Sequence, residues 1–334
     1  MRAAILRAPR DLELSETPTP APGPGDALVR VGVAGLCGTD YRIWSGGRSV
    51  AYPRVMGHEF VGHVEAIGEG VTRVAVGDRV AVEPNYSCGA CPLCREGNRN
   101  LCLARVAIGI DVDGCFAEVV RVPARCCWPA PVGVADEDLV LTEPLAVVVR
   151  AVERAAVRRG ETMAVVGVGT LGLLALQVLR ARGARVLCVG RTERRFALAR
   201  ELGAEAVHAT SSGSLETAAR AFSGREGVDG VIETAGAPEA VNHALELVRP
   251  GGRVVLTGLP HAPSTVSFFS VVRREVTITG SMIYQDEFVE AMRLVAAGHV
   301  RTGPLITHRI PLDAIARAFI AHEEPTAIKV AVLP

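Results

Sequence analysis

From residue 161 onward, short apolar segments alternate with segments of helical pattern, and this alternation most constrains the fold. The apolar segments are rich in Val, Ile and Leu and have the length of buried strands. They occupy residues 162–169, 184–190, 227–236, 252–258 and 276–282, and the helical segments occupy 170–183, 194–204 and 237–250. Parallel strands need crossover helices between them. The sequence therefore predicts a doubly wound α/β domain with a parallel sheet covered by helices.

The first part of the chain differs in composition and in the pattern of its apolar residues. Residues 1 to about 125 are rich in Gly, Pro and Val, with short apolar runs such as ALVRVGVAG and DRVAVEP between turn residues. This pattern indicates an irregular, mainly β domain. The length of 334 residues also exceeds one ordinary core. A helix-rich tail begins at Asp286 and ends in an apolar strand, residues 328–334, which we expect to rejoin the first domain.

Charge and hydropathy point to a small-molecule partner. The 36 basic side chains balance the 36 acidic ones, so the chain has no excess of positive charge that would indicate binding to nucleic acid. No apolar run of about 18 residues is present, and residues 1–5 lack the pattern of a secretory signal. We therefore expect a cytoplasmic protein with no nucleic-acid or membrane partner, whose nine cysteines are metal ligands and core thiols rather than disulfides. Lys329 is the only lysine, which by itself is not evidence of function.

A glycine-rich motif joins the first apolar segment to the first helical one. Gly167, Gly169 and Gly172 form the pattern GxGxxG, with Thr170 and Leu171 inside it. Glycines at these places permit a tight turn and let a pyrophosphate approach the helix amino terminus, whose free amides favour anions. The alternative, a glycine turn without ligand, is disfavoured by the strand before the motif and the helix after it. Further candidates for contact with a dinucleotide follow a later strand: Thr257, Gly258 and Leu259.

The end of the second strand indicates which dinucleotide binds. Folds of this type that prefer NAD usually place Asp or Glu there, bonded to the ribose hydroxyls, but this chain has Gly190. Arg191 and Thr192 follow, and Arg194 and Arg195 come next, so a 2′-phosphate would meet guanidinium groups. One such contact favours binding about ten- to a hundredfold. We therefore favour NADP over NAD; the alternative is that these arginines are solvated residues at a helix start.

Three short segments carry residues that commonly bind metals. They are CGTD at residues 37–40, GHE at 57–59 and TEPL at 142–145. Thiolate, imidazole and carboxylate are the mixture from which zinc sites with three protein ligands and one open position are built. Taken singly, a cysteine is most often a buried apolar residue and a histidine a hydrogen-bonded structural one. Their joint appearance ahead of a dinucleotide fold favours a metal site.

A fourth segment carries four cysteines, Cys88, Cys91, Cys94 and Cys102, in the spacing CxxCxxCx7C. Four thiolates on one loop can close a tetrahedron around zinc and leave no position for a substrate. We therefore expect a second, structural zinc ion here. An iron–sulfur cluster is one alternative, although its motif has a different fourth spacing, and unliganded thiols are another. The cysteines outside these segments are expected to be core thiols.

Taken together, the motifs resemble the zinc-dependent medium-chain dehydrogenase/reductase family, which includes alcohol, sorbitol, threonine and butanediol dehydrogenases. CGTD, GHEFVG, the cysteine cluster, GVGTLG and the helix–strand tail stand in the family's order and spacing over essentially the whole chain. The resemblance implies a GroES-like catalytic domain over residues 1–147, completed by 284–334, and a Rossmann domain over 148–283. It also implies a homo-oligomer, either a tetramer or a dimer.

The resemblance further implies a catalytic zinc bound by Cys37 and His58, with Glu59 as a near or exchanging ligand. Glu143 stands where typical alcohol dehydrogenases have cysteine, which is similar to the polyol dehydrogenase branch. Which of the two glutamates binds directly stays open. Thr39 stands at the place of the family's proton-relay hydroxyl.

Arg42 is a departure from the family, because many members continue the relay through a histidine at its place. An arginine is always protonated and cannot act as a neutral base. The later relay is therefore expected to run through the cofactor ribose. Asp40 is expected behind the site, where it either orients a zinc-ligand imidazole or only forms a turn.

The implied reaction is reversible hydride transfer between NAD(P) and a secondary alcohol, polyol, sugar or cyclitol, with the ketone as oxidised product. Primary alcohols or aldehydes are the alternative substrates within the family. A non-catalytic protein that binds zinc and nucleotide is the alternative outside it. The complete set of reactive residues argues against that alternative: Cys37, Thr39, His58, Glu59 and Glu143.

Overall fold

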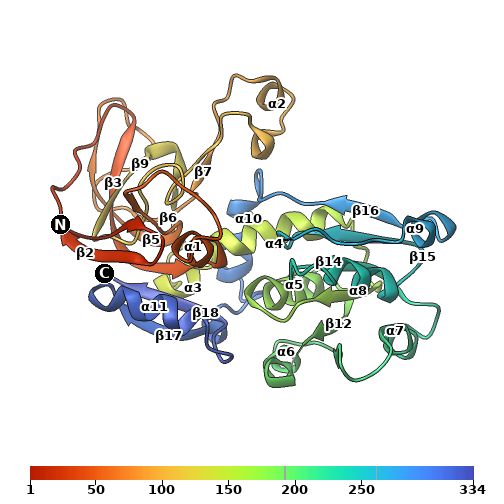
Figure 1. Cartoon of the computed structure of the whole chain (residues 1–334). Coiled ribbons are helices and arrows are strands. Elements are labelled where there is room, and N and C mark those ends of the chain that lie inside the picture. The colour runs from red at the N-terminus through yellow and green to blue at the C-terminus, as the bar shows by residue number, and fades with distance from the viewer. Residues whose placement is uncertain (192, 261) are drawn as a thin grey trace. The chain divides into compact units, whose positions relative to one another are not determined.

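The computed structural model describes residues 1–191, 193–260 and 262–334, and its contacts divide the chain into two units (Figure 1). Unit 1 comprises Met1–Glu143, Ala291–Ala296 and Thr302–Pro334, and unit 2 comprises Pro144–Glu290 and Ala297–Arg301. Two of the borders fall inside helices, α4 (Thr142–Arg154) and α10 (Glu287–Ala296). The domain borders at residues 147 and 283 stay a prediction.

Unit 1 is built on a sheet with the strand order β10-β6-β5-β3-β18-β17, in which β9 also pairs with β3. Its strands are β3 (Asp26–Leu36), β5 (Glu59–Ile67), β6 (Arg79–Val82), β9 (Val119–Pro123), β10 (Cys127–Pro129), β17 (Ile306–Pro311) and β18 (Lys329–Leu333). On one side of β3, Gly35 pairs with Glu59 of β5, and on the other Leu36 pairs with Val330 of β18. Both neighbours therefore meet β3 at the end that leads into Cys37.

Smaller elements complete unit 1. A second sheet has the order β2-β1-β4, and a hairpin pairs β7 with β8. These strands are β1 (Arg2–Ala8), β2 (Asp11–Glu16), β4 (Arg54–Val55), β7 (Asn85–Tyr86) and β8 (Val106–Ala107); the helices are α1 (Gly38–Trp44), α2 (Pro92–Arg95), α3 (Asp136–Leu139) and α11 (Ile315–His322). Trp44 of α1 stacks on Phe319 of α11 with ring centroids 5.2 Å apart, and Phe116 meets Phe319 edge-on at 6.1 Å. These aromatic contacts fix α1 against the core.

Unit 2 contains a parallel sheet with the strand order β13-β12-β11-β14-β15-β16. Its strands are β11 (Thr162–Val166), β12 (Arg185–Gly190), β13 (Ala206–Ala209), β14 (Val228–Glu233), β15 (Val248–Leu256) and β16 (Thr277–Gly280); its helices include α5 (Thr170–Ala181), α6 (Phe196–Glu201), α7 (Leu215–Ser223), α8 (Ala240–Leu247) and α9 (Phe268–Arg273). The chain leaves β11 toward β12 on one side and later returns to its other side with β14. This reversal is the switch point at which open α/β sheets bind ligands.

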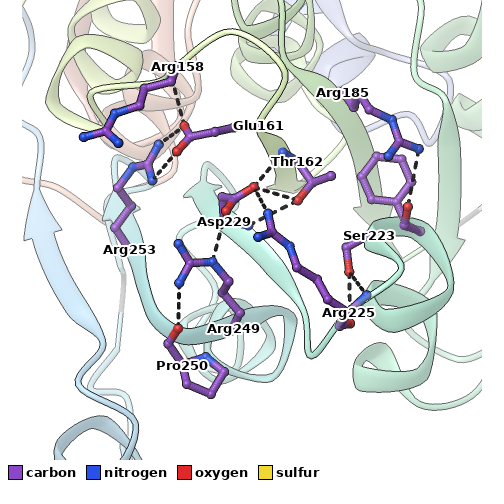
Figure 2. Close-up of polar contacts among 11 residues, drawn as sticks. Arg158, Glu161, Thr162, Arg185, Ser223, Arg225, Asp229, Arg249, Pro250 and Arg253 are labelled. Atoms are coloured by element: carbon purple, nitrogen blue, oxygen red, sulfur yellow. Dashed lines mark hydrogen bonds and ion pairs between the residues drawn. The ribbon is translucent and has the colours of Figure 1, made fainter.

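The amino ends of three strands of unit 2 are joined by one buried carboxylate (Figure 2). Asp229 of β14 accepts hydrogen bonds from the amide and hydroxyl of Thr162 at 2.9 and 3.0 Å, and from Nε of Arg249 at 3.0 Å. Arg225 also donates to it. Burial acts to raise the pKa of Asp229, but these hydrogen bonds and charges lower it below its ordinary value. Asp229 therefore holds the ends of β11, β14 and β15 together as an anion.

The fold class predicted from the sequence is confirmed, with a mainly β unit and a doubly wound parallel sheet. The sequence did not predict β13, whose residues Ala206 to His208 are only half-buried. No helix within the described ranges combines the length and the apolar character that crossing a bilayer requires.

Candidate active site

Cys37, His58 and Glu59 gather at one point of unit 1. Cys37 follows β3 and caps α1, where its Sγ lies 3.5 Å from the amide nitrogen of Thr39. His58 and Glu59 stand at the start of β5. One ligand atom from each of the three residues lies within 4.8 Å of the others. His58 and Glu59 are buried, whereas Cys37 is half-buried, so the group is accessible from the cysteine side.

The carboxylate of Asp40 contacts the residues that carry this group. It is fully buried and accepts a hydrogen bond from the amide of Cys37 at 2.9 Å and from that of Gly57 at 3.3 Å. Nδ1 of His58 lies 3.2 Å from Oδ1 of Asp40, which leaves Nε2 as the nitrogen for a metal ion. Burial acts to lower the pKa of His58, but the charges of Asp40 and Cys37 raise it well above its ordinary value.

Lys329 is part of the same group, a contact that the sequence motifs do not predict. Its Nζ lies 2.6 and 2.8 Å from the two carboxylate oxygens of Glu59 and 3.1 Å from the carbonyl oxygen of Leu36. The side chain is 4% exposed. Burial acts to lower the pKa of Lys329, but the charges of Glu59 and Cys37 raise it, so the ammonium group stays charged. One signal was available: a single lysine within the apolar strand IKVAVLP.

Glu143 lies near the group without belonging to its compact core. It stands in the first turn of α4 and is 8% exposed. Burial raises its pKa to about 7; the charge of His58 acts to lower the pKa, and the charge of Glu59 raises it further. Glu143 is not one of the three residues whose ligand atoms gather within 4.8 Å. Its carboxylate is therefore near enough to feel the charges of the group but lies outside the compact set of ligand atoms.

The donor set fits a zinc ion. A thiol, an imidazole and carboxylates are the ligands of open zinc sites. Negative charge is also concentrated here, since Asp40 and Glu59 both act to raise the pKa of Glu143 while Lys329 acts to lower it. A divalent cation would neutralise that excess.

Two further residues with roles predicted from the sequence, Thr39 and Arg42, lie in α1. Thr39 and Arg42 are both half-buried. They are three residues apart on the helix and so share one face. The predicted relay hydroxyl and the arginine at the place of the relay histidine thus lie on one face of α1, the helix that Cys37 caps.

The four cysteines of residues 88–102 form a second compact group. Their Sγ atoms all lie within 4.8 Å of one another, with 3.5 Å between Cys88 and Cys102 and 3.9 Å between Cys91 and Cys102. A tetrahedron with Zn–S bonds of about 2.3 Å has edges of about 3.8 Å. Backbone amides of Ala90 and Cys91 donate to Sγ of Cys88, each at 3.4 Å. Amide hydrogen bonds also lower the pKa of Cys91 to about 6, whereas desolvation and the neighbouring thiols Cys91 and Cys102 raise the pKa of Cys94 to about 11. A bound metal ion would favour the thiolate form of all four.

The glycine motif of unit 2 has the close approaches that a phosphate-binding turn requires. Gly167 has φ +104°, and a Cβ on Gly172 would lie 1.8 Å from the carbonyl oxygen of Gly167. A side chain at either place is therefore excluded or strained. Gly169 caps α5, which begins at Thr170, and Leu171 lies in its first turn. The free amides of this helix start are suited to a pyrophosphate.

The last residue of β12 is Gly190, which has no carboxylate, and Arg191 follows it directly. A Cβ on Gly190 would lie 2.8 Å from a methyl carbon of Val168, so any side chain there would require Val168 to shift. Arg195 donates to the carbonyl oxygen of Val168 at 3.3 Å, and burial together with the charge of Arg191 lowers its pKa. The two guanidinium groups therefore stand close enough to repel. Thr192 lies outside the described residues.

The remaining predicted cofactor residues follow β15, close to a carboxylate that sequence reasoning missed. Glu233, buried at the end of β14, accepts hydrogen bonds from the amides of Ala235 and Gly236, at 2.6 and 2.8 Å, and its carbonyl accepts from Thr257 and Gly258. Within the described part of the chain, the buried hydroxyl of Thr257 has no hydrogen-bond partner. A bound ligand could supply that partner. Leu259 is 52% exposed.

Comparison with known proteins agrees with this arrangement. Residues 23–132 match the family model of the alcohol dehydrogenase GroES-like domain, and residues 170–297 match that of the zinc-binding dehydrogenases. The L-threonine 3-dehydrogenase of Bacillus velezensis is 34% identical, covering 96% of this chain and 95% of that protein.

Two solved structures are similar over nearly their full length. A protein of Sinorhizobium meliloti 1021 assigned as a zinc-binding dehydrogenase, bound to NADP, has a TM-score of 0.95 and 35% identity, covering 100% of this chain and 99% of that one. The alcohol dehydrogenase rspB of Escherichia coli CFT073, in complex with NADH, has a TM-score of 0.94 and 32% identity, with coverage of 100% and 99%.

A GroES-like domain, a parallel nucleotide-binding sheet and a zinc-type donor set thus occur in one chain. The chain belongs to the zinc-dependent medium-chain dehydrogenase/reductase family, as its motifs predicted. It is an NAD(P)-dependent alcohol dehydrogenase in the broad sense, an enzyme that acts on the CH–OH group of its donors.

Proposed function

We propose that the enzyme oxidises a secondary alcohol, such as a polyol, a sugar or a cyclitol, to a ketone and catalyses the reverse reduction. The observation that carries this proposal is the group of half-buried Cys37 and buried His58 and Glu59, with its ligand atoms within 4.8 Å of one another. Glu143 in place of a cysteine enriches the site in oxygen ligands, as in the polyol-oxidising branch. The L-threonine oxidised by a 34% identical relative is itself a secondary alcohol.

Each residue of this site has its own proposed role. Cys37 and His58 would hold the zinc ion, Asp40 fixes the imidazole, and Glu59 is the third donor, balanced by Lys329. Zinc bound there supplies a Lewis acid that stabilises negative charge on the substrate oxygen. The Thr39 hydroxyl takes the alcohol proton and passes it toward solvent. NAD(P), when bound, would supply the acceptor for the hydride from the carbon atom. Glu143 is the ligand that would trade places with water or substrate.

The second zinc ion would be structural. Cys88, Cys91, Cys94 and Cys102 supply four thiolates, which leave no coordination position for a substrate. Their group lies on a segment with two short helical turns, α2 (Pro92–Arg95) and residues 99–101. So short a segment buries little apolar surface, so a metal cross-link is a sufficient reason for its order.

NADP is the preferred cofactor in this proposal. Gly167, Gly169, Thr170, Leu171 and Gly172 would bind the pyrophosphate. The positive charge beyond β12 would bind the 2′-phosphate, through Arg191 and Arg195. Support comes from the mutual repulsion of these two guanidinium groups, which an anion would relieve, and from the NADP in a 35% identical structure.

We also propose that the enzyme is a homo-oligomer, a dimer or a tetramer. Helix α9 exposes Phe268, Phe269 and Val272 by 69%, 72% and 75%. The helix leads directly into β16, which is an edge strand of the parallel sheet. An apolar patch beside an open strand edge is the kind of surface that a second copy covers.

The proposed reaction is tested by following cofactor absorbance over a panel of polyols, diols, amino alcohols, primary alcohols and sugars with both NAD and NADP. Metal content is measured on the same preparation. Two zinc ions per chain with turnover of secondary alcohols support the proposal. Turnover confined to primary alcohols would contradict the proposal and indicate a primary-alcohol dehydrogenase instead. Cofactor binding without any turnover would indicate a binding protein.

A further inference from the structure

A half-buried positive charge lies on α1, the helix that Cys37 of the proposed metal site caps. Thr39 and Arg42 share one face of this helix. The helical rise places the Cα of Arg42 about 7.5 Å along the axis from that of Cys37. A long arginine side chain at that separation can reach a group on a substrate held at Cys37.

A second arginine returns to the same place. Gly46 has φ +87°, a conformation that turns the chain just after α1. The amide of Arg48 then donates to the carbonyl oxygen of Arg42 at 3.1 Å. Both arginines are half-buried. Two guanidinium side chains therefore start from adjacent backbone positions on the segment that follows Cys37.

Neither guanidinium group is paired within the described residues. The nearby carboxylates are engaged elsewhere: Asp40 with the Cys37 amide and His58, Glu59 with Lys329, and Glu323 with a tyrosine hydroxyl. A partly buried charge normally has a counter-ion or a hydrogen-bond partner. Two such charges, whose side chains start from hydrogen-bonded backbone positions, could both be neutralised by one anion.

We propose that Arg42 and Arg48 form an anion subsite, and that the preferred substrate carries a carboxylate or phosphate besides its CH–OH group. This inference rests on the proposed function. Arginine is suited to such a role, because its planar fork binds both oxygens of a carboxylate or phosphate. It is not suited to the proton relay whose histidine Arg42 replaces. The permanent positive charge of Arg42 prevents it from acting as a proton relay. The same charge is suited to selecting an anionic substrate.

The test compares matched substrates that differ only in charge. Values of kcat/KM are measured for a neutral polyol, the corresponding aldonate and the corresponding polyol monophosphate, with the wild type, Arg42→Gln, Arg48→Gln and the double variant. Arg30→Gln is the control, since Arg30 is 57% exposed and pairs with Glu65. Binding of the same three compounds to each variant is measured by calorimetry without turnover.

The wild type is expected to prefer one anionic substrate over the neutral polyol. Each single substitution should lower kcat/KM for that anion about 10- to 100-fold and leave the neutral polyol and the KM for the cofactor unchanged. Comparison of kcat/KM for the aldonate and for the polyol monophosphate shows which anion is preferred. An equal loss for all three substrates, or a raised KM for the cofactor alone, would overturn the subsite.

The calorimetric arm separates this inference from the proposed function. If no compound is oxidised, the proposed function fails. The subsite then stands if the anions bind to the wild type and lose affinity in Arg42→Gln, and falls if their affinity is the same in both.

Discussion

Lys329, in the last strand of unit 1, forms a buried ion pair with Glu59, in a strand 270 residues earlier, with Nζ 2.6 and 2.8 Å from the two carboxylate oxygens. Its ammonium group also donates to the Leu36 carbonyl at 3.1 Å, one residue before Cys37. A metal ion that binds Glu59 therefore competes with a fixed positive charge. We interpret Lys329 as the group that keeps Glu59 deprotonated and in place as the third donor.

Replacement of Lys329 by Gln should make the zinc-free protein less stable and more dependent on zinc. The substitution leaves the Glu59 carboxylate buried without its counter-ion, which costs about 3 kcal/mol, and added zinc then takes over the neutralisation. Thermal unfolding with and without a chelator measures the effect. The zinc-induced rise in Tm should be larger in the variant than in the wild type, while kcat falls. An equal rise in both proteins would show that Lys329 does not act on the metal group.

Asp229→Asn should lower stability at neutral pH by about 3 kcal/mol, because it removes a buried anion that two arginines and Thr162 hold. The folded pKa of Asp229 lies below the unfolded one. Its contribution is therefore present above about pH 4 and is lost as pH falls through the folded pKa.

Denaturant unfolding from pH 7 down to pH 3 measures this contribution. The wild type should lose stability more steeply than the variant below about pH 4, so that the two curves converge. Glu205→Gln is the control, since Glu205 forms an exposed pair with Arg185 and should change stability by less than about 1 kcal/mol. Parallel curves for Asp229→Asn and the wild type would contradict the role given to Asp229.

The double substitution Arg191→Ser and Arg195→Ser should move the cofactor preference from NADP toward NAD. Each lost contact with the 2′-phosphate lowers kcat/KM for NADP about tenfold or more, and NAD, which has no such phosphate, should be affected little. The exposed Arg200 of α6, changed to Ser, is the control. A wild type that already prefers NAD would refute the assignment.

Phe268→Asp together with Phe269→Asp should dissociate the oligomer. Both side chains are largely exposed in the single chain, so the substitutions cost the monomer little, whereas two charges in an apolar interface oppose association. Sedimentation equilibrium measures the mass of the wild type and of the variant. Exposed Val76, 62% exposed in unit 1, changed to Asp, is the control. A monomeric wild type, or an unchanged mass in the variant, would contradict the proposed interface.

The fold was largely predictable because its signals are local. The strands from β11 to β16 are apolar runs bounded by glycines, and the exception, β13, is a half-buried edge strand of four residues without that pattern. Glu233 and Asp229 were missed for a related reason. Each is a polar residue inside an apolar strand, and its partners come from other strands or from backbone amides.

The candidate ligands were predictable from motifs, but their geometry was not. Cys37, His58 and Glu59 stand in short recognisable segments. Lys329 lies in the tail, and its contact with Glu59 depends on β18 pairing with β3 in the register that sets Val330 opposite Leu36. No local pattern encodes such a register. The lesser proximity of Glu143 likewise follows from the position of α4, not from its motif.

The most direct test of the account compares the two cysteine groups in one experiment. Zinc content and NADP-linked oxidation of the best polyol are measured for the wild type, Cys37→Ser and Cys91→Ser. Cys37→Ser should retain the zinc of the four-cysteine group and lose turnover by at least about a thousandfold, whereas Cys91→Ser should lose that zinc and, where it stays folded, keep kcat/KM within about tenfold. Unchanged turnover in Cys37→Ser would contradict the assignment of the chemistry to Cys37, His58 and Glu59.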